Sequence, residues 1–174
     1  MSDRPGLFDF AGQKARTLDL WQRTPWDDIA LFVGPNAKRF QRAWQATRAK
    51  FEGGRGGIAF GFCLPALLFG FAWFLYRRMW TMGAMLLVLP VALSYFFASA
   101  GGSIGLSIAM SLFGKSLYMQ HAVARIGALR ERGAGDEEIA AAGGTSLVGG
   151  LVGGVILAAG IGSLIYLIAT GASL

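Results

Sequence analysis

The sequence predicts an all-α integral membrane protein with a basic helical region ahead of its membrane part. Three observations indicate this fold class. Of the 174 residues, 54% are hydrophobic and only 15% are charged, whereas a soluble domain carries about 25% charged residues. The charges are also segregated, because residues 1–57 hold ten of the sixteen Lys and Arg and residues 79–114 hold none. Finally, the uncharged runs are long enough to cross a bilayer.

The charge balance and the single cysteine exclude several classes of protein. The net charge of +6 indicates contact with anionic lipid at the cytoplasmic face rather than with nucleic acid, because the basic residues are interleaved with Asp and Glu. Cys63 is the only cysteine, so an internal disulfide is excluded. The first fifty residues contain no apolar stretch of the signal-peptide type, and we expect the N-terminus to lie in the cytoplasm.

Residues 1–56 are expected to form a basic cytoplasmic region of short helices. Thr24 is a suitable N-cap for a helix over residues 25–33, since proline fits the first helical position and two aspartates follow in the first turn. The Gly34–Pro35 pair should end this helix.

A second helix is predicted from Asn36 to about Phe51, and it is amphipathic. Its apolar positions are spaced by three and four residues: Phe40, Ala43, Trp44, Thr47 and Phe51. Lysine and arginine occupy much of the remaining surface. This apolar stripe either packs on the protein's own membrane core, which we favour, or lies on anionic lipid or a partner as a surface amphipathic helix.

Residues 57–174 are expected to form the membrane domain. It opens with twenty uncharged residues at 57–76, followed by a second uncharged run of thirty-six residues at 79–114. The second run would extend about 54 Å as one helix, which exceeds a hydrocarbon core of about 30 Å. The small residues at 98–103 therefore predict a turn within it.

Three spans follow from this division. We expect spans over residues 80–97, 103–119 and 147–170. The second should continue beyond the bilayer as a cytoplasmic helix to about residue 132. A short helix at 136–142, flanked by glycines, should precede the last span.

Two topologies remain for the segment 57–76. If it is a fourth span, six of the sixteen basic residues lie outside, which conflicts with the positive-inside rule. If it enters and returns on the same side, all sixteen are cytoplasmic. Gly61, Pro65 and Gly70 would interrupt a helix near its middle, as a re-entrant or interfacial segment requires. We favour the re-entrant topology, with three full spans.

The densest group of aromatic and basic residues follows this segment directly. It comprises Trp73, Tyr76, Arg77, Arg78 and Trp80. Aromatic rings with arginine at headgroup level are typical of an interfacial anchor, which is the interpretation we favour. The sharper hypothesis is a contact site for an anionic lipid headgroup or a partner, in which an arginine pairs with phosphate oxygens.

The last span carries a regular series of small residues. Gly150, Gly154, Ala158 and Gly162 recur every four residues, and Gly149 with Gly153 forms a parallel pair. Small residues at this spacing let another helix approach closely. The pattern predicts close helix packing, either within the chain or between copies of it.

No pattern in the sequence predicts a reaction. We expect no catalytic residue, no metal site and no cofactor, because there is no nucleophile–base pair and no metal-ligand spacing. Lys115 and His121 lie near the end of a predicted span and are interpreted as interfacial side chains. The predicted spans contain no Asp or Glu, which argues against an ion-coupled transporter.

Two blocks of sequence resemble a known family. The first is Phe32-Val33-Gly34-Pro35-Asn36, followed by Phe40 and Trp44. The second runs from Ala59-Phe60 to Trp73-Phe74-Leu75-Tyr76-Arg77-Arg78-Met79-Trp80. Together they resemble a family of small bacterial multi-pass inner-membrane proteins catalogued as a domain of unknown function. Members usually have an Asn-Trp pair where Gly57-Ile58 stands here.

Two shorter stretches extend the resemblance. They are Tyr118, His121 and Arg125, and then Gly143-Gly144-Thr145-Ser146. The resemblance covers about residues 30–146 and implies a protein of the bacterial cytoplasmic membrane. It transfers no activity, since the family has none assigned.

Taken together, the residues predict a non-enzymatic accessory or scaffold subunit of the bacterial inner membrane. It would act through helix–helix contacts and contacts with a bilayer of anionic headgroups, in a homo-oligomer or a larger membrane complex. The alternative is a small oligomeric transporter or channel assembled around the glycine series.

Overall fold

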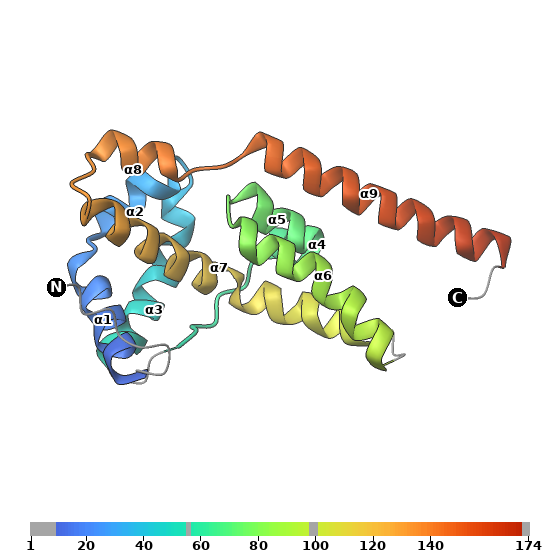
Figure 1. The fold of residues 1–174 in the computed structure, drawn as a ribbon, viewed down its shortest axis with the longest axis horizontal. Coiled ribbons are helices and arrows are strands. Elements are labelled where there is room, and N and C mark those ends of the chain that lie inside the picture. Colours follow the sequence, from blue (N-terminus) through green and yellow to red (C-terminus); the bar gives the residue numbers. More distant parts are fainter. Residues whose placement is uncertain (1–9, 55–56, 98–100, 172–174) are drawn as a thin grey trace. The chain divides into compact units, whose positions relative to one another are not determined.

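The computed structural model describes residues 10–54, 57–97 and 101–171, and all regular elements within these ranges are helices (Figure 1). The chain divides into two compact units. Unit 1 comprises residues 1–62 and 113–144, and unit 2 comprises residues 63–112 and 145–174. The long helix α7 (Gly101–Arg130) contributes residues to both units.

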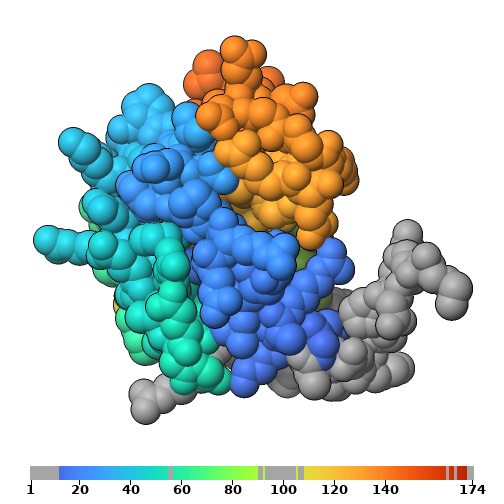
Figure 2. All heavy atoms as spheres, turned by 90° about the vertical axis from the view of Figure 1, so that its left-hand side faces the viewer, coloured from blue at the N-terminus to red at the C-terminus, as the bar shows by residue number. Residues whose placement is uncertain are grey.

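Unit 1 is a cluster of short helices around the C-terminal part of α7. Its other elements are α1 (Phe10–Arg23), α2 (Trp26–Val33), the 3-10 helix η1 (Ala37–Phe40), α3 (Gln41–Glu52) and α8 (Asp136–Ala142). Figure 2 shows the face on which α1, α2 and α3, in blue to cyan, form one continuous surface with α8, in orange. The helices α1, α2 and α3 of the N-terminal region therefore pack in one unit with α8, which follows α7 in the sequence.

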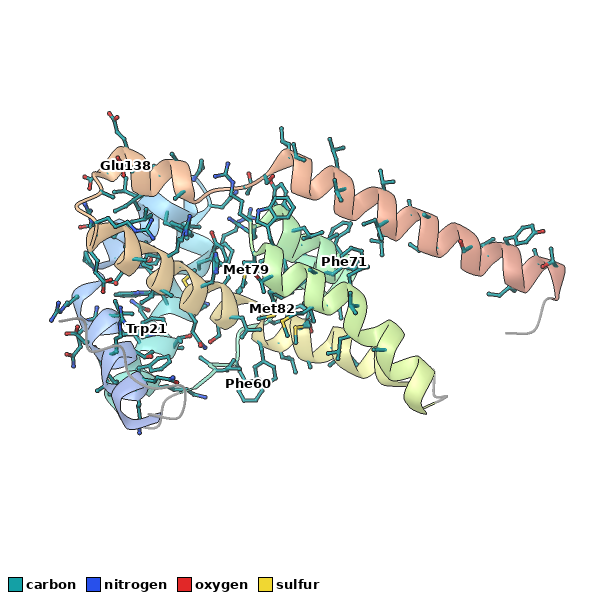
Figure 3. The ribbon with its side chains drawn as sticks, in the orientation of Figure 1. Trp21, Phe60, Phe71, Met79, Met82 and Glu138 are labelled. Atoms are coloured by element: carbon teal, nitrogen blue, oxygen red, sulfur yellow. The ribbon has the colours of Figure 1, made fainter. Side chains whose placement is uncertain are left out.

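The core of unit 1 is built on α7. Tyr118, Met119 and Ile126 are fully buried there. Tyr118 packs against the ring of Phe40 with ring centroids 5.2 Å apart. Trp21 lies on the side of α1 that faces α3 (Figure 3) and is also fully buried. Each of these large side chains stabilises the fold by about 1.5–3 kcal/mol relative to exposure in water.

The start of α2 differs from the predicted cap. Pro25 occupies the N-cap position and the helix begins at Trp26. Thr24 instead ends α1, because its amide and its hydroxyl both donate to the Leu20 carbonyl, at 3.0 and 2.7 Å. The prediction of Thr24 as an N-cap is therefore wrong. Gly34, with φ 80°, ends α2 as predicted.

Unit 2 contains the hydrophobic helices. They are α4 (Leu64–Phe69), α5 (Phe71–Tyr76), α6 (Trp80–Phe97), residues 101–112 of α7, and α9 (Leu147–Thr170). Residues 57–76 do not form one helix, because the chain is extended up to Cys63 and breaks again at Gly70 (φ 48°). With six residues each, α4 and α5 extend about 9 Å apiece, far less than a bilayer core.

One helical segment in the described ranges is long and apolar enough to cross a membrane. It lies within Asp136–Thr170 and corresponds to α9. A shorter apolar stretch, Trp80–Leu89, lies in α6. Of the predicted turn at 98–103, residues 98–100 lie outside the described residues, and residues 101–103 already belong to α7.

The predicted span 103–119 is divided between the two units. Residues 113–119 belong to unit 1, where Tyr118 and Met119 are in the core. Hydropathy alone assigns these residues to the membrane, because a buried core helix and a lipid-buried helix are equally apolar. Residues 113–144 accordingly pack with the N-terminal region rather than with the other hydrophobic helices.

Candidate functional site

The charged residues divide sharply between the two units. All ten Asp and Glu and fourteen of the sixteen Lys and Arg belong to unit 1. By sequence, unit 2 holds two charged residues, Arg77 and Arg78. They follow α5 directly, and we call residues 76–80 the arginine turn. Because this turn concentrates the charge of an otherwise uncharged unit, it is the leading candidate for a functional site.

The backbone of the arginine turn forms a Schellman motif. The Arg78 amide donates to the Leu75 carbonyl at 3.0 Å, and the Met79 amide donates to the Phe74 carbonyl at 2.9 Å. Arg78 has φ 60° and is the non-glycine residue with positive φ in the described ranges. This position is usually glycine. A side chain there costs about 1–2 kcal/mol.

The start of α9 is attached to the same turn. The Ser146 amide donates to the Tyr76 carbonyl at 2.7 Å. The Ser146 hydroxyl then caps α9 by accepting a hydrogen bond from the Gly149 amide at 3.0 Å. A helix N-terminus carries partial positive charge. Two arginines and a helix N-terminus therefore share one end of unit 2, which favours an anionic ligand there.

The five residues predicted from the sequence as a lipid-headgroup or partner site lie together in this region, in two layers. Trp73 and Arg77 are buried, and Tyr76 is half-buried. Arg78 is exposed, and the Trp80 side chain is 50% exposed. An exposed guanidinium beside an exposed indole is an arrangement that suits the headgroup level of a bilayer. The inner layer positions this pair.

The glycine series of α9 is divided between two environments. A Cβ atom at Gly149 would lie 2.9 Å from the Leu75 carbonyl carbon, and one at Gly153 would lie 2.7 Å from the Ala72 Cβ. Gly150 similarly faces the Tyr76 ring, at 3.0 Å. These glycines let α5 approach α9 closely.

The other small residues of the predicted series do not pack against α5. Gly154 and Gly162 have nothing within 4 Å of their Cβ positions, and Ala158 is exposed. Among the residues that the structure describes, the small-residue pattern thus packs against the chain only over the first two turns of α9. The other turns present small residues on an open surface.

The apolar stripe of α3 and η1 is buried inside unit 1. Phe40, Trp44 and Phe51 are each less than 10% exposed. Phe51 stacks on Trp21 with ring centroids 5.1 Å apart, and Arg48 covers the Trp44 ring at 5.1 Å. The alternative in which this stripe lies on lipid as a surface helix is therefore wrong. The stripe packs within the chain, as favoured, but in the core of unit 1 rather than on the hydrophobic helices of unit 2.

A network of ion pairs in unit 1 was not predictable from sequence. Arg130 donates to both oxygens of Asp28, at 2.6 and 3.1 Å, and to Asp136 Oδ1 at 2.7 Å. It also donates to the Ala134 carbonyl at 3.1 Å. The hydrogen bonds from Asp28 first, and then from Asp136, raise the pKa of Arg130. The network joins α2, α7 and α8 across 102 positions of sequence, and no local pattern indicates such a contact.

A polar pocket of about 220 Å³ adjoins this network. Its lining comes from α1, the start of α2 and α7: Asp19, Leu20, Arg23, Thr24, Asp28, Ile126, Gly127, Arg130 and Glu131. Arg23 pairs with Asp19 at 2.7 Å, and Arg16 with Glu131 at 3.6 Å. No group of three metal-ligating side chains occurs in the part of the chain that the structure describes. Each charged side chain of the lining thus has an ion-pair partner, which for Glu131 is Arg16 from outside the lining.

Lys115 and His121, the side chains interpreted from the sequence as interfacial, belong to unit 1. Tyr118 is a core residue, and Lys115 and His121 are half-buried in unit 1. Burial, and then the charge of Arg125, lowers the pKa of His121 below its ordinary value.

A family model described as "Protein of unknown function (DUF2628)" matches residues 21–130, more than half of the chain. The chain belongs to the DUF2628 family. This membership agrees with the resemblance to a family of unknown function. No curated protein and no solved structure matches the chain.

The region matched by the DUF2628 model covers parts of both units. It includes the arginine turn and ends at Arg130, so it contains both partners of the Asp28–Arg130 pair. It leaves out α8 and α9. In this DUF2628 protein, Gly149 and Gly153 therefore attach a helix from beyond the matched region to α5, which lies within it.

Proposed function

We propose that this DUF2628 protein is a non-enzymatic accessory or scaffold subunit of the bacterial inner membrane, with unit 2 in lipid and unit 1 in the cytoplasm. The division of charge carries the proposal. Twenty-four of the twenty-six charged residues belong to unit 1, although its two segments are separated by fifty residues of sequence. A unit with two arginines and no acidic residue suits a bilayer.

The exterior of unit 2 supports the same placement. Outside the arginine turn, its large exposed side chains are mainly apolar and occur on α4, α6, α7 and α9, for example Leu68, Phe69, Met85, Val88, Ile108, Leu151, Val155, Ile161 and Ile165. Soluble proteins rarely expose contiguous apolar surface of more than a few hundred Å². Lipid would cover these side chains without a loss of hydrogen bonds.

The packing of α5 favours the re-entrant topology. α5 contacts Gly149 and Gly153 in the first two turns of α9, and Gly83 in the first turn of α6. The 24 residues of α9 extend about 36 Å, so α5 accompanies only its beginning. Residues 64–76 would then stay near the arginine turn at one face of the bilayer. All sixteen basic residues would lie on the cytoplasmic side, in agreement with the positive-inside rule.

Labelling of single cysteines tests this topology. In a Cys63→Ser background, Arg78→Cys and Thr170→Cys are each exposed to an impermeant thiol reagent from either side of the membrane. The proposal expects Arg78→Cys to react from the cytoplasmic side and Thr170→Cys from the periplasmic side. With four spans both sides are reversed, and that result would reject the re-entrant topology. A chain that fractionates as a soluble protein would reject the membrane placement itself.

The open small-residue surface of α9 supports a role in assembly. Gly154, Ala158 and Gly162 would let a helix from another protein approach closely in lipid. If the partner is a different protein, purification in mild detergent should yield a larger complex that Gly154→Leu dissociates. Recovery of the same complex with Gly154→Leu would contradict this role.

The same surface favours one alternative function, a small oligomeric transporter or channel. A second copy of α9 could occupy the open face of Gly154 and Gly162. That alternative predicts a homo-oligomer that conducts or transports solute in liposomes. A heteromeric complex without flux supports the accessory subunit instead.

A further inference from the structure

The extended segment between α3 and α4 has exposed side chains at every second position, with buried Ala59 and half-buried Gly61 between them. Ile58, Phe60 and Phe62 are 38%, 71% and 55% exposed, whereas Ala59 between them is 2% exposed. Successive side chains of an extended chain point to opposite sides. The three exposed side chains therefore form one row along the edge of unit 1, which we call the aromatic edge. Figure 3 shows Phe60 projecting away from the ribbon.

Contacts of the inward residues fix this orientation. The Ala59 amide donates to the Ser116 hydroxyl of α7 at 3.0 Å, and that hydroxyl also contacts the Thr47 hydroxyl at 3.0 Å. Gly61 faces Ala43 and Lys115, with its Cβ position 3.8 and 3.7 Å from their Cβ atoms. Rotation of the segment would break this buried hydrogen bond. The outward position of the aromatic edge is thus imposed by the fold.

Basic side chains flank the aromatic edge. The Lys50 ammonium donates to the Ile58 carbonyl at 2.7 Å and lies 5.9 Å from the centre of the Phe60 ring. Lys14 donates to the Gly54 carbonyl at 2.9 Å, next to the same segment. Lys115 adjoins Gly61. Ammonium groups beside exposed aromatic rings suit a surface where acyl chains meet phosphate groups.

We infer that the aromatic edge inserts into the headgroup region of the cytoplasmic leaflet and that Lys50 pairs with anionic phospholipid there. Two observations select lipid as the occupant. The charges beside the row are positive, and the chain continues from Phe62 directly into the uncharged unit 2. The inference rests on the membrane placement proposed above. It adds a second lipid contact, made by the otherwise cytoplasmic unit.

Site-specific fluorescence in lipid nanodiscs tests the inference on the full chain. Cysteines replace Phe60, Val155 or Glu138 in the Cys63→Ser background, and each carries an environment-sensitive dye. Val155 on α9 reports the bilayer, and Glu138, which points away from α8 (Figure 3), reports water. We expect blue-shifted emission at position 60, with stronger quenching by lipids labelled near the headgroup than by lipids labelled at mid-chain.

A second experiment varies the charge of the lipid. Lys50→Glu should move the emission at position 60 toward that of position 138 in discs with anionic lipid and leave it unchanged in zwitterionic discs. If the dye at position 60 emits like the dye at position 138 in both lipids while the dye at position 155 still reports lipid, the inference about the aromatic edge is overturned. The membrane placement of unit 2 then still stands. A polar environment at 155 would overturn the membrane placement as well. A shift at 60 that depends on the number of chains per disc, without lipid quenching, would assign the edge to a second copy and also overturn the inference.

Discussion

Arg78 occupies a backbone position that normally belongs to glycine. Its φ of 60° and the two hydrogen bonds that close the Schellman motif leave the turn geometry intact, but a non-glycine residue is strained there. Strain of this kind is found where the side chain serves a purpose that outweighs its cost in stability. We propose that at Arg78 this purpose is an exposed positive charge at the end of an apolar unit.

Replacing Arg78 with glycine should separate stability from lipid binding. We expect Arg78→Gly to stabilise the protein by about 1 kcal/mol, since the strain is relieved, while binding to vesicles with anionic lipid weakens. Thermal unfolding in detergent and vesicle co-sedimentation measure the two effects. Arg78→Lys is the control, because it keeps both charge and strain and should change neither quantity much. A destabilised glycine variant, or one with unchanged binding, would contradict the assignment.

His121 is the titratable residue in unit 1 whose protonation opposes folding. Burial and the neighbouring Arg125 lower its pKa in the folded state below its ordinary value of 6.5. The unfolded chain therefore binds more protons at this site than the folded chain below about pH 6.5. Well above pH 6.5 the imidazole is neutral in both the folded and the unfolded chain, so it does not change the free energy of unfolding there.

Stability should accordingly fall as the pH is lowered through 6.5. We expect the melting temperature to drop more between pH 7.5 and pH 5.5 in the wild type than in His121→Gln, which has no titrating imidazole. Differential scanning fluorimetry at a series of pH values provides the comparison. Parallel pH profiles for the two proteins would show that His121 is not responsible.

At the scale of elements, the packing of α5 on α9 depends on which glycine faces it. Gly149 and Gly153 touch the backbone or Cβ of α5 residues, while Gly154 faces open space. Gly153 and Gly154 are adjacent in sequence and lie in the same helix, so helix propensity affects both equally. They differ only in what an added methyl group meets.

The same substitution at these two positions should have opposite effects. Gly153→Ala should destabilise unit 2, because its Cβ would lie 2.7 Å from the Ala72 Cβ. Gly154→Ala should stabilise α9 by up to about 1 kcal/mol through helix propensity. Melting temperatures in detergent report both effects. Equal shifts for the two variants would mean that α5 does not pack on α9 in this way.

At the scale of the whole molecule, one chain contains two units with opposite surfaces. Unit 1 buries aromatic rings and carries nearly all of the charge, while unit 2 exposes apolar side chains on α4, α6, α7 and α9. The chain passes between the units three times. Each passage therefore moves between a charged and an uncharged environment.

A single arginine on each unit tests this contrast. Val155→Arg near the middle of α9 should impair membrane insertion, at a cost of about 2.5–3.5 kcal/mol at a helix centre. Leu31→Arg, at an exposed apolar position of unit 1, should be tolerated. Membrane fractionation and expression level give the readout. Equal tolerance of both changes would reject the lipid environment of α9.

The sequence by itself determined the helices and much of the arginine turn. The predicted helix over 25–33 and the apolar segments over 80–97 and 147–170 match α2, α6 and α9 closely, because spacing, glycine and proline act locally. The five aromatic and basic residues at 73–80 lie together because they are close in sequence. Hydropathy could not decide which apolar residues face protein and which face the surface.

Only the tertiary structure decided how these helices are distributed. It placed residues 113–119 in the core of unit 1, buried Phe40, Trp44 and Phe51, and paired Asp28 with Arg130. It also separated Gly153, which packs on α5, from Gly154, which is open. These outcomes depend on contacts between residues far apart in the chain. Such contacts leave no period or motif in the sequence, since hydrophobic burial has no direction and a salt bridge needs only two residues.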